Sequence, residues 1–339
     1  MKINILLMVI VLMWILEPGC STVWAQNRAE EPTASDVVAP IGISGFGDFF
    51  IQANRQDVAQ TYNVGQMEVD LETHIAEKVV IGAAVAYDGE NFGLGAFTVD
   101  LHLLGSKGDH FHSNSGIMHS GIIVGQFDVP FGIDWHVYPS IDRKLVSAPL
   151  VIENTHNGWN DFGVQAYLEA GKMNVVAYAT NGFCSEGLGC PVDVDKKMAA
   201  VGSRVGIKPH STLEIGGSWA GFLYPDDDRD RVMAGGDVQF AYQNVFFKGE
   251  YVVHQVSLAS KQTLTRRGFY GQGLYDFGKT YVVARYGNFS PGDAQVEDLT
   301  RLSVGGGWVI LDGCELRFEY QRNSQDGGRL AFTQLVVGF

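Results

Sequence analysis

The chain has 339 residues, and its 42 glycines and 12% aromatic residues stand beside a charged fraction of only 18%. Acidic residues outnumber basic ones by 38 to 24, so the net charge is −14, which argues against the basic surface of a nucleic-acid-binding protein. The aromatic content excludes an intrinsically disordered chain, and no apolar run beyond the N-terminus reaches the length of a transmembrane helix. A glycine- and aromatic-rich β-protein remains.

The N-terminus carries the three parts of a secretory signal peptide. Lys2 precedes an apolar run from Ile3 to Leu16, a polar break follows, and Val23-Trp24-Ala25 supplies a cleavage site. A membrane anchor is the alternative, but the run is short for a hydrocarbon core of about 30 Å. A lipoprotein signal at Cys20 is disfavoured because Glu17 stands where an aliphatic residue is required. We therefore expect residues 1–25 to be a cleaved signal peptide, followed by a periplasmic segment over residues 26–39.

Two of the three cysteines that remain after this cleavage lie in one short loop. Cys184 and Cys190 enclose a glycine-containing stretch, so in an oxidising compartment we expect a disulfide rather than two free thiols. Cys314 has no evident partner. No second ligand pair accompanies the two cysteines, and His110 and His112 lie on a turn where solvated side chains are the simpler explanation. We therefore expect neither a metal site nor a cofactor.

From Pro40 onward, apolar and polar residues alternate in segments of roughly 10 to 14 residues that are separated by turn residues. In the segment 67–75, Met67, Val69 and Leu71 fall on one face, and the acidic residues that alternate with them fall on the other. This period of two predicts sixteen strands, at 40–54, 65–77, 78–90, 91–105, 116–132, 159–171, 172–182, 198–209, 212–224, 232–243, 245–256, 266–278, 280–290, 299–311, 314–324 and 330–339.

The connections between these strands differ in length in a regular way. Those that follow odd-numbered strands are mostly long and polar, whereas those that follow even-numbered strands are mostly tight, as at Gly171-Lys172 and Asp312-Gly313. The stretch 105–115 is an exception on the short side. An even strand number with short turns on one side is typical of transmembrane β-barrels of the bacterial outer membrane. A soluble β-sandwich also alternates, but the long series of segments favours one antiparallel transmembrane barrel over residues 40–339, with short periplasmic turns and longer extracellular loops.

The last predicted strand ends on an aromatic residue. In the segment 330–339, Leu335, Val337 and Phe339 share one face. This arrangement resembles the C-terminal strand signal by which barrels reach the insertion machinery of the outer membrane. We expect Phe339 to be the membrane-insertion signal and the machinery to be a partner of this strand.

A barrel of about sixteen strands is wide enough to leave an aqueous channel, so the polar face is expected to line a lumen. Acidic residues dominate that face, and a ring of one charge sign sets ion preference in pores, so we hypothesise a weak preference for cations. The inward acidic candidates are Glu68, Asp70, Glu72, Asp100, Asp161, Glu169, Glu214, Asp237, Glu250, Glu315 and Glu319, and the basic ones are Arg204, Lys248, Arg285, Arg301 and Arg317.

The longest internal connection, Ile133 to Gly158, follows the fifth predicted strand. General porins fold a long loop at this place into the lumen. On that interpretation the constriction candidates are Asp134, Asp142, Arg143, Lys144 and Glu153. A surface loop that packs over the mouth of the barrel is the alternative, and the residues alone favour neither.

Around this loop the chain resembles the phosphate-selective porin O and P family. The resemblance rests on Gly125-Gln126-Phe127-Asp128-Val129-Pro130-Phe131-Gly132, on Asp142-Arg143, and on Gly158-Trp159-Asn160-Asp161-Phe162-Gly163-Val164-Gln165. That family has a G-[QR]-F-x-x-P-F-G strand end, a long third loop and a strand that begins near G-x-[DN]-x-G-[VI]-Q. The match is specific over residues 120–182 and implies a 16-stranded, usually trimeric diffusion channel. Family members line their pores with Lys and Arg, whereas acids dominate here, so phosphate selectivity is not implied.

The sequence thus predicts an outer-membrane porin for passive diffusion of small ions and solutes. A structural or adhesive barrel is the alternative, and an enzyme is not expected because no convincing nucleophile–base pair is present. The expected partners are outer-membrane lipid and lipopolysaccharide, the barrel-insertion machinery, small ions or solutes, and further copies of the chain in a homotrimer; nucleic acid is not among them.

Overall fold

The structure is a computed structural model that describes residues 40–54, 60–76, 78–87, 91–105, 118–137, 139–182, 199–223, 231–257, 263–293, 295–324 and 328–339. The predicted signal peptide and periplasmic segment, Cys184, Cys190, His110 and His112 lie outside these residues. Cys314 lies inside them and is a free thiol.

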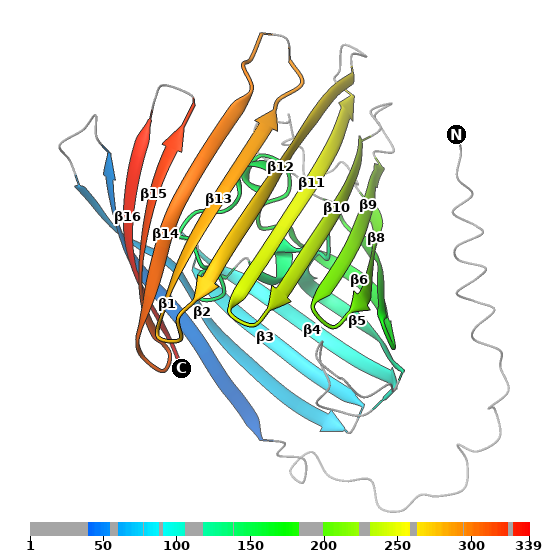
Figure 1. Ribbon diagram of the computed structural model, residues 1–339. Helices are drawn as coiled ribbons and strands as arrows, with labels where there is room; N and C mark the ends of the chain where they lie inside the picture. Colours follow the sequence, from blue (N-terminus) through cyan, green and yellow to red (C-terminus); the bar gives the residue numbers. More distant parts are fainter. Residues whose placement is uncertain are drawn as a thin grey trace, which may run out of the picture. The chain divides into compact units, whose positions relative to one another are not determined.

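The described residues form sixteen strands, which follow the predicted segments one for one (Figure 1). They are β1 Ile41–Asn54, β2 Gln60–Ala76, β3 Val79–Tyr87, β4 Phe92–Leu104, β5 His119–Asp128, β6 Asn160–Ala170, β7 Met173–Thr180, β8 Ala199–His210, β9 Leu213–Leu223, β10 Arg231–Tyr242, β11 Val245–Ser257, β12 Thr263–Asp276, β13 Thr280–Ser290, β14 Leu299–Leu311, β15 Cys314–Asn323 and β16 Arg329–Gly338.

Each strand pairs antiparallel with its neighbours in the chain, and β1 also pairs with β16, so the sheet closes into a barrel. Phe46 lies opposite Gly338 at this seam. Beyond the last paired strand residues, the amide of Phe339 donates to the carbonyl of Gly45 over 2.9 Å, and the amide of Gly45 donates back over 3.1 Å. The prediction of a 16-stranded antiparallel barrel is confirmed.

The two faces of the strands are those that the alternation predicts. In β13, Tyr281, Val283 and Arg285 are buried, whereas Val282 and Tyr286, which alternate with them, are about half exposed. Successive side chains of a strand point to opposite sides of the sheet, so one set faces the barrel interior and the other faces outward. Large apolar side chains of the outward set are exposed on strands all around the barrel.

One strand ends earlier than predicted. The segment 116–132 was expected to be extended throughout, but β5 stops at Asp128, opposite Asn160 of β6. Pro130 has no amide proton to give to a ladder, and the amide of Phe131 turns back to the carbonyl of Val129 over 2.8 Å. The chain therefore leaves the barrel wall four residues before the predicted end and begins its long connection there.

Helical structure among the described residues is limited to two single turns of that connection, the 3₁₀ turn η1 (Asp134–Val137) and α2 (Leu150–Glu153). None of the helices in the described ranges has the length and apolar character that crossing a membrane demands.

Candidate functional site

The connection between β5 and β6, residues 129–159, lies inside the barrel (Figure 1). We call it the inner loop. Of the two arrangements that the sequence left open, the structure has the loop in the lumen rather than over the mouth. Its contacts with the wall decide which parts of the lumen remain open.

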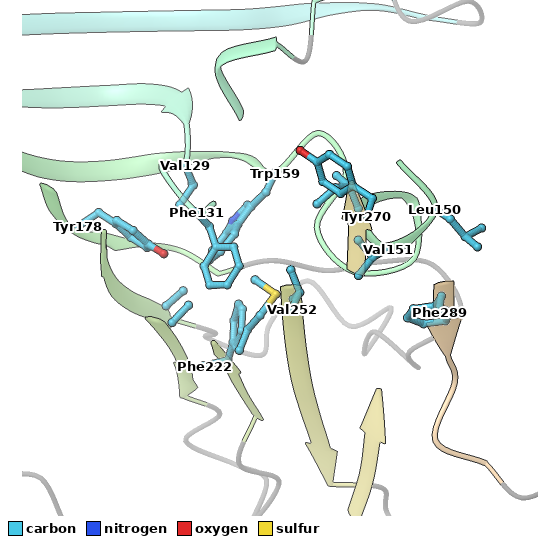
Figure 2. Packing of buried hydrophobic residues seen from close by; sticks show 14 of the residues in the cluster. Val129, Phe131, Leu150, Val151, Trp159, Tyr178, Phe222, Val252, Tyr270 and Phe289 are labelled. Carbon is cyan, nitrogen blue, oxygen red and sulfur yellow. The ribbon is translucent and has the colours of Figure 1, made fainter. Parts of the chain in front are cut away.

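An apolar cluster fastens the inner loop to one side of the barrel. Phe131, Val151 and Trp159 of the loop are buried, and Figure 2 shows Phe131 and Trp159 between Tyr178 and Phe222 of the wall. Burying each such side chain stabilises the packed loop by about 1.5–3 kcal/mol. The wall residues of the cluster come from β5 and from strands β7 to β13 and are Phe127, Tyr178, Ala200, Ala220, Phe222, Met233, Val252, Tyr270 and Phe289.

All five basic residues that were predicted to point inward contact this loop. Lys248 donates to Asp134 Oδ1 over 2.7 Å, and the hydroxyl of Tyr270 donates to the same oxygen over 3.0 Å. The other four bonds are from Arg204 Nε to Gly132 O at 2.6 Å, Arg285 Nη2 to Ser147 O at 2.9 Å, Arg301 Nη1 to Glu153 Oε1 at 2.8 Å and Arg317 Nη2 to Ile141 O at 2.8 Å.

Acidic residues of the same wall complete these interactions. Glu319 accepts from the amide of Ser147 over 2.8 Å and from its hydroxyl over 2.7 Å. Glu315 lies 2.6 Å from Arg317 and 3.3 Å from Lys144 of the loop. The five predicted inward cations of this wall are therefore matched by neighbouring carboxylates, and they hold the loop instead of facing open water.

Burial changes the titration of three groups on the inner loop. Burial by itself raises the pKa of Asp134, but the charge and hydrogen bond of Lys248, together with the charges of Arg285 and Arg143, outweigh it, so the pKa of Asp134 lies below its usual range. Burial raises the pKa of Asp142, although Lys144 and Arg317 oppose the shift. Burial lowers the pKa of His156 to about 4. At neutral pH the loop therefore holds an ionised Asp134 and a neutral His156.

The five constriction candidates have different surroundings. Asp134 is buried in its pair with Lys248, Lys144 pairs with Glu315, and Glu153 pairs with Arg301. Asp134, Asp142, Arg143 and Lys144 line a cavity of about 440 Å³ between the loop and the wall. Three of the five thus have a counter-charge within salt-bridge distance.

A second cavity, of about 350 Å³, lies on the side of the barrel away from the anchored wall. Its acidic lining residues are Glu68 and Asp70 of β2 and Asp128 at the end of β5. We call this cavity the acidic passage. Among the described residues, no Lys, Arg or His lines it or lies within salt-bridge distance of these carboxylates. Small inward residues leave the space open beside them, namely Ala84, Ala86, Gly93, Gly95 and Ala96.

The remaining lumen candidates have structural contacts. Asp100 is buried and accepts from the hydroxyl of Tyr167 over 3.1 Å. Asp161, at the start of β6, accepts from the amide of Gly182 over 2.6 Å. Asp237 pairs with Arg204 over 2.8 Å. Glu72 is exposed and lies 3.2 Å from His74.

Two parts of the site were missed from the sequence. Asp128 was quoted only within the family motif, yet its position as the last residue of β5 places it on the passage. The apolar inward residues, such as Phe222, Met233 and Val252, were missed because alternation alone predicts a polar interior. A run such as Gly221-Phe222-Leu223, apolar on both faces, was the available signal.

No model of a known protein family matches the chain, and no curated protein matches it. Solved structures do. The anion-selective porin from Comamonas acidovorans has a TM-score of 0.66 at 12% identity, covering 89% of this chain and 100% of its own.

Salmonella typhi OmpF in complex with daunomycin also has a TM-score of 0.66, at 8% identity over 89% of this chain and 98% of its own. The trimer form of OmpT, an outer membrane protein of Vibrio cholerae, has a TM-score of 0.63 at 12% identity, covering 89% and 99%. The chain shares the barrel fold of these proteins, and its resemblance to the porin O and P family rests on the quoted motifs alone.

Proposed function

We propose that the protein is an outer-membrane porin, a water-filled channel for passive diffusion of small ions and solutes that prefers cations. The observation that carries the proposal is the acidic passage beside the inner loop, in which Glu68, Asp70 and Asp128 have no basic counterpart among the residues that the structure describes. Carboxylates that line a narrow aqueous path attract cations and repel anions.

The position of the loop supports this preference. The five basic residues predicted to point inward lie on the anchored wall and have carboxylates within salt-bridge distance, as in Lys248 with Asp134 and Arg317 with Glu315, while Arg266 donates to the loop carbonyl of Asn154. Paired charges create a weak field at a distance, because the two contributions nearly cancel. The unpaired carboxylates of the acidic passage therefore dominate the field that a passing ion meets.

The family resemblance supports the channel and its assembly, but not phosphate as the solute. An acidic passage would repel phosphate, which lysine- and arginine-lined pores attract. We include a homotrimer in the proposal, because the resemblance implies it and the Vibrio cholerae protein is described in a trimer form. Export through a cleaved signal peptide and contact with lipopolysaccharide belong to the same proposal.

The test is the reversal potential of the purified protein in planar bilayers under a salt gradient. We expect a cation-selective sign for the unaltered channel. The combined change Glu68→Gln, Asp70→Asn and Asp128→Asn should move the potential toward zero, because it removes the fixed charge of the passage. The matched control is Glu72→Gln on the same strand, which does not line the passage and should leave the potential unchanged.

An anion-selective unaltered channel would contradict the preference. Failure to conduct would instead favour a structural or adhesive barrel. Esterase and protease assays on the same preparation should give no activity above background, and native mass should equal three chains.

A further inference from the structure

The larger cavity, between the inner loop and strands β8 to β13, has an apolar floor on the lumen face. Ala241 lies opposite Phe246, and Phe246 lies opposite Leu274, so the three form one continuous row across β10, β11 and β12. All three line the cavity, and Phe246 is 41% exposed there. Inward positions of a water-filled barrel are usually polar, so an exposed apolar row calls for an occupant with an apolar face.

A polar row runs beside this floor. Its residues face the lumen, and those on β10, β11 and β12 are two positions from those of the floor. Gln239 lies opposite Lys248, Lys248 opposite Gln272, and Gln272 opposite Arg285, and all four line the cavity. Lys248 and Arg285 are occupied by their bonds to Asp134 and Ser147.

The side-chain amides of Gln239 and Gln272, unlike the two cations of this row, have no hydrogen-bond partner in the part of the chain that the structure describes, although both backbones pair in the sheet. Gln272 is only 8% exposed, and a polar side chain so deeply buried usually has a partner. A ligand that brings hydroxyl groups would supply both donors and acceptors to these amides.

The charges around the cavity do not favour an ionic ligand. Lys248 pairs with Asp134 at 2.7 Å, Lys208 with Glu214 at 3.7 Å and Arg285 with Glu319 at 3.7 Å. Asp142 and Arg143, adjacent on the loop, add one charge of each sign. Lys144 pairs with Glu315 at 3.3 Å, and Asp276 accepts from the backbone amide of Gly278 over 2.7 Å. A charged ligand would have to compete with these existing pairs, whereas a neutral one would not.

We infer that this cavity binds a neutral, hydroxylated solute with an apolar face, the chemistry of a monosaccharide ring. The ring packs on Phe246 and Leu274, and its hydroxyl groups bond to Gln239 and Gln272. The volume of about 440 Å³ and the mixture of an apolar surface with a few polar groups are those of small-molecule sites. The inference rests on the proposed channel only in that the solute reaches the cavity through the lumen.

The test is equilibrium binding of D-glucose to the full detergent-solubilised protein, followed by saturation-transfer NMR. We expect binding that weakens about tenfold, or about 1.4 kcal/mol, in Phe246→Leu and in Gln272→Leu. The control is Phe269→Leu, which removes an outward-facing ring of β12 that does not line the cavity and should leave binding unchanged. Competition with benzylamine and with phenylacetate tests the charge of the ligand.

Absence of glucose binding by a protein that conducts ions would overturn the site and leave the channel standing. Binding that survives both Phe246→Leu and Gln272→Leu would also overturn it, as would tighter binding of benzylamine or phenylacetate than of glucose. Glucose binding by a protein that does not conduct would support the site and count against the channel.

Discussion

The imidazole of His156 is buried where the inner loop meets the wall. Its ring centroid lies 4.8 Å from that of Phe131 in an edge-on contact, and the Thr155 hydroxyl lies 2.9 Å from Nδ1. Burial penalises the charged ring and lowers the pKa of His156 to about 4. The packed loop therefore favours the neutral imidazole. Protonation of His156 at low pH destabilises the folded protein, because the charged ring is buried.

This burial predicts a pH dependence of stability. The pKa in the folded protein lies below that of an unfolded histidine, so the contribution is present above about pH 6.5 and is lost as the pH falls toward 4. The full loss amounts to about 3 kcal/mol. In denaturant unfolding at pH 7.5 and pH 4.5, the unaltered protein should lose more stability than His156→Gln.

The comparison between the two proteins isolates the histidine. Asp142 has a raised pKa, so its contribution has the opposite sign, but it is present in both proteins and cancels in the difference. Equal losses of stability in the unaltered protein and His156→Gln would contradict the prediction.

At the scale of elements, the inner loop is attached to one wall of the barrel, and this attachment decides where the lumen stays open. Large apolar side chains such as Phe222 and Met233 meet the loop on strands β7 to β13. The inward residues beside the acidic passage on β3 and β4 are small, for example Ala84 and Gly95. The loop therefore closes the lumen where this apolar packing occurs, whereas a cavity of about 350 Å³ remains beside β2 to β4 and one of about 440 Å³ remains between the loop and β8 to β13.

Gly132 is near the start of the inner loop, where the loop first bonds to the barrel wall. Its φ of +67° lies in the left-handed region, its carbonyl accepts from Arg204, and its amide donates to the Ser218 hydroxyl over 2.9 Å. A Cβ atom at Gly132 would overlap the carboxylate of Glu250. Only glycine satisfies both the backbone conformation and the close approach to the wall.

The expected result is that Gly132→Ala costs more stability than a matched change elsewhere. Gly278 also has a positive φ, of +97°, but a Cβ atom there meets nothing within 4 Å. Gly278→Ala should therefore cost only the backbone strain, about 1–3 kcal/mol, whereas Gly132→Ala adds the clash with Glu250. Denaturant unfolding measures both variants, and equal costs would show that the contact with the wall does not matter.

For the molecule as a whole, the seam between the first and last strands closes the barrel. Phe339 takes part through its backbone, which exchanges hydrogen bonds with Gly45, while its ring is 73% exposed. The backbone closes the sheet whatever the side chain is. The exposed ring is therefore available to a partner, as the predicted insertion signal requires.

These two roles separate in Phe339→Ala. The change keeps the backbone bonds, so folding of purified chain into detergent or lipid should be nearly as complete as for the unaltered protein. In cells we expect a severalfold loss of folded barrel in the outer membrane, because the change removes the terminal aromatic residue that we predict to be the insertion signal. Heat-modifiable mobility on gels measures the folded fraction in both settings. A loss of folding in purified lipid as well would assign the ring to stability and not to recognition.

The strand number, the strand order and the two faces of each strand were predictable from the sequence. Alternation and turn length are local properties, so a segment such as 67–75 identifies its own outward and inward residues. The barrel then follows, because strands with one apolar face and short connections to their neighbours pair antiparallel and must close to remove their edges.

Only the tertiary structure decided what the inward charges do. Arg204 and Glu68 occupy equivalent inward positions in their strands, yet Arg204 bonds to a loop carbonyl 72 residues away, whereas Glu68 lines the acidic passage. The difference arises because the inner loop folds against one wall, through contacts between residues far apart in the chain. Alternation shows which side chains point inward, but pairing and packing across the lumen determine which of them meet water.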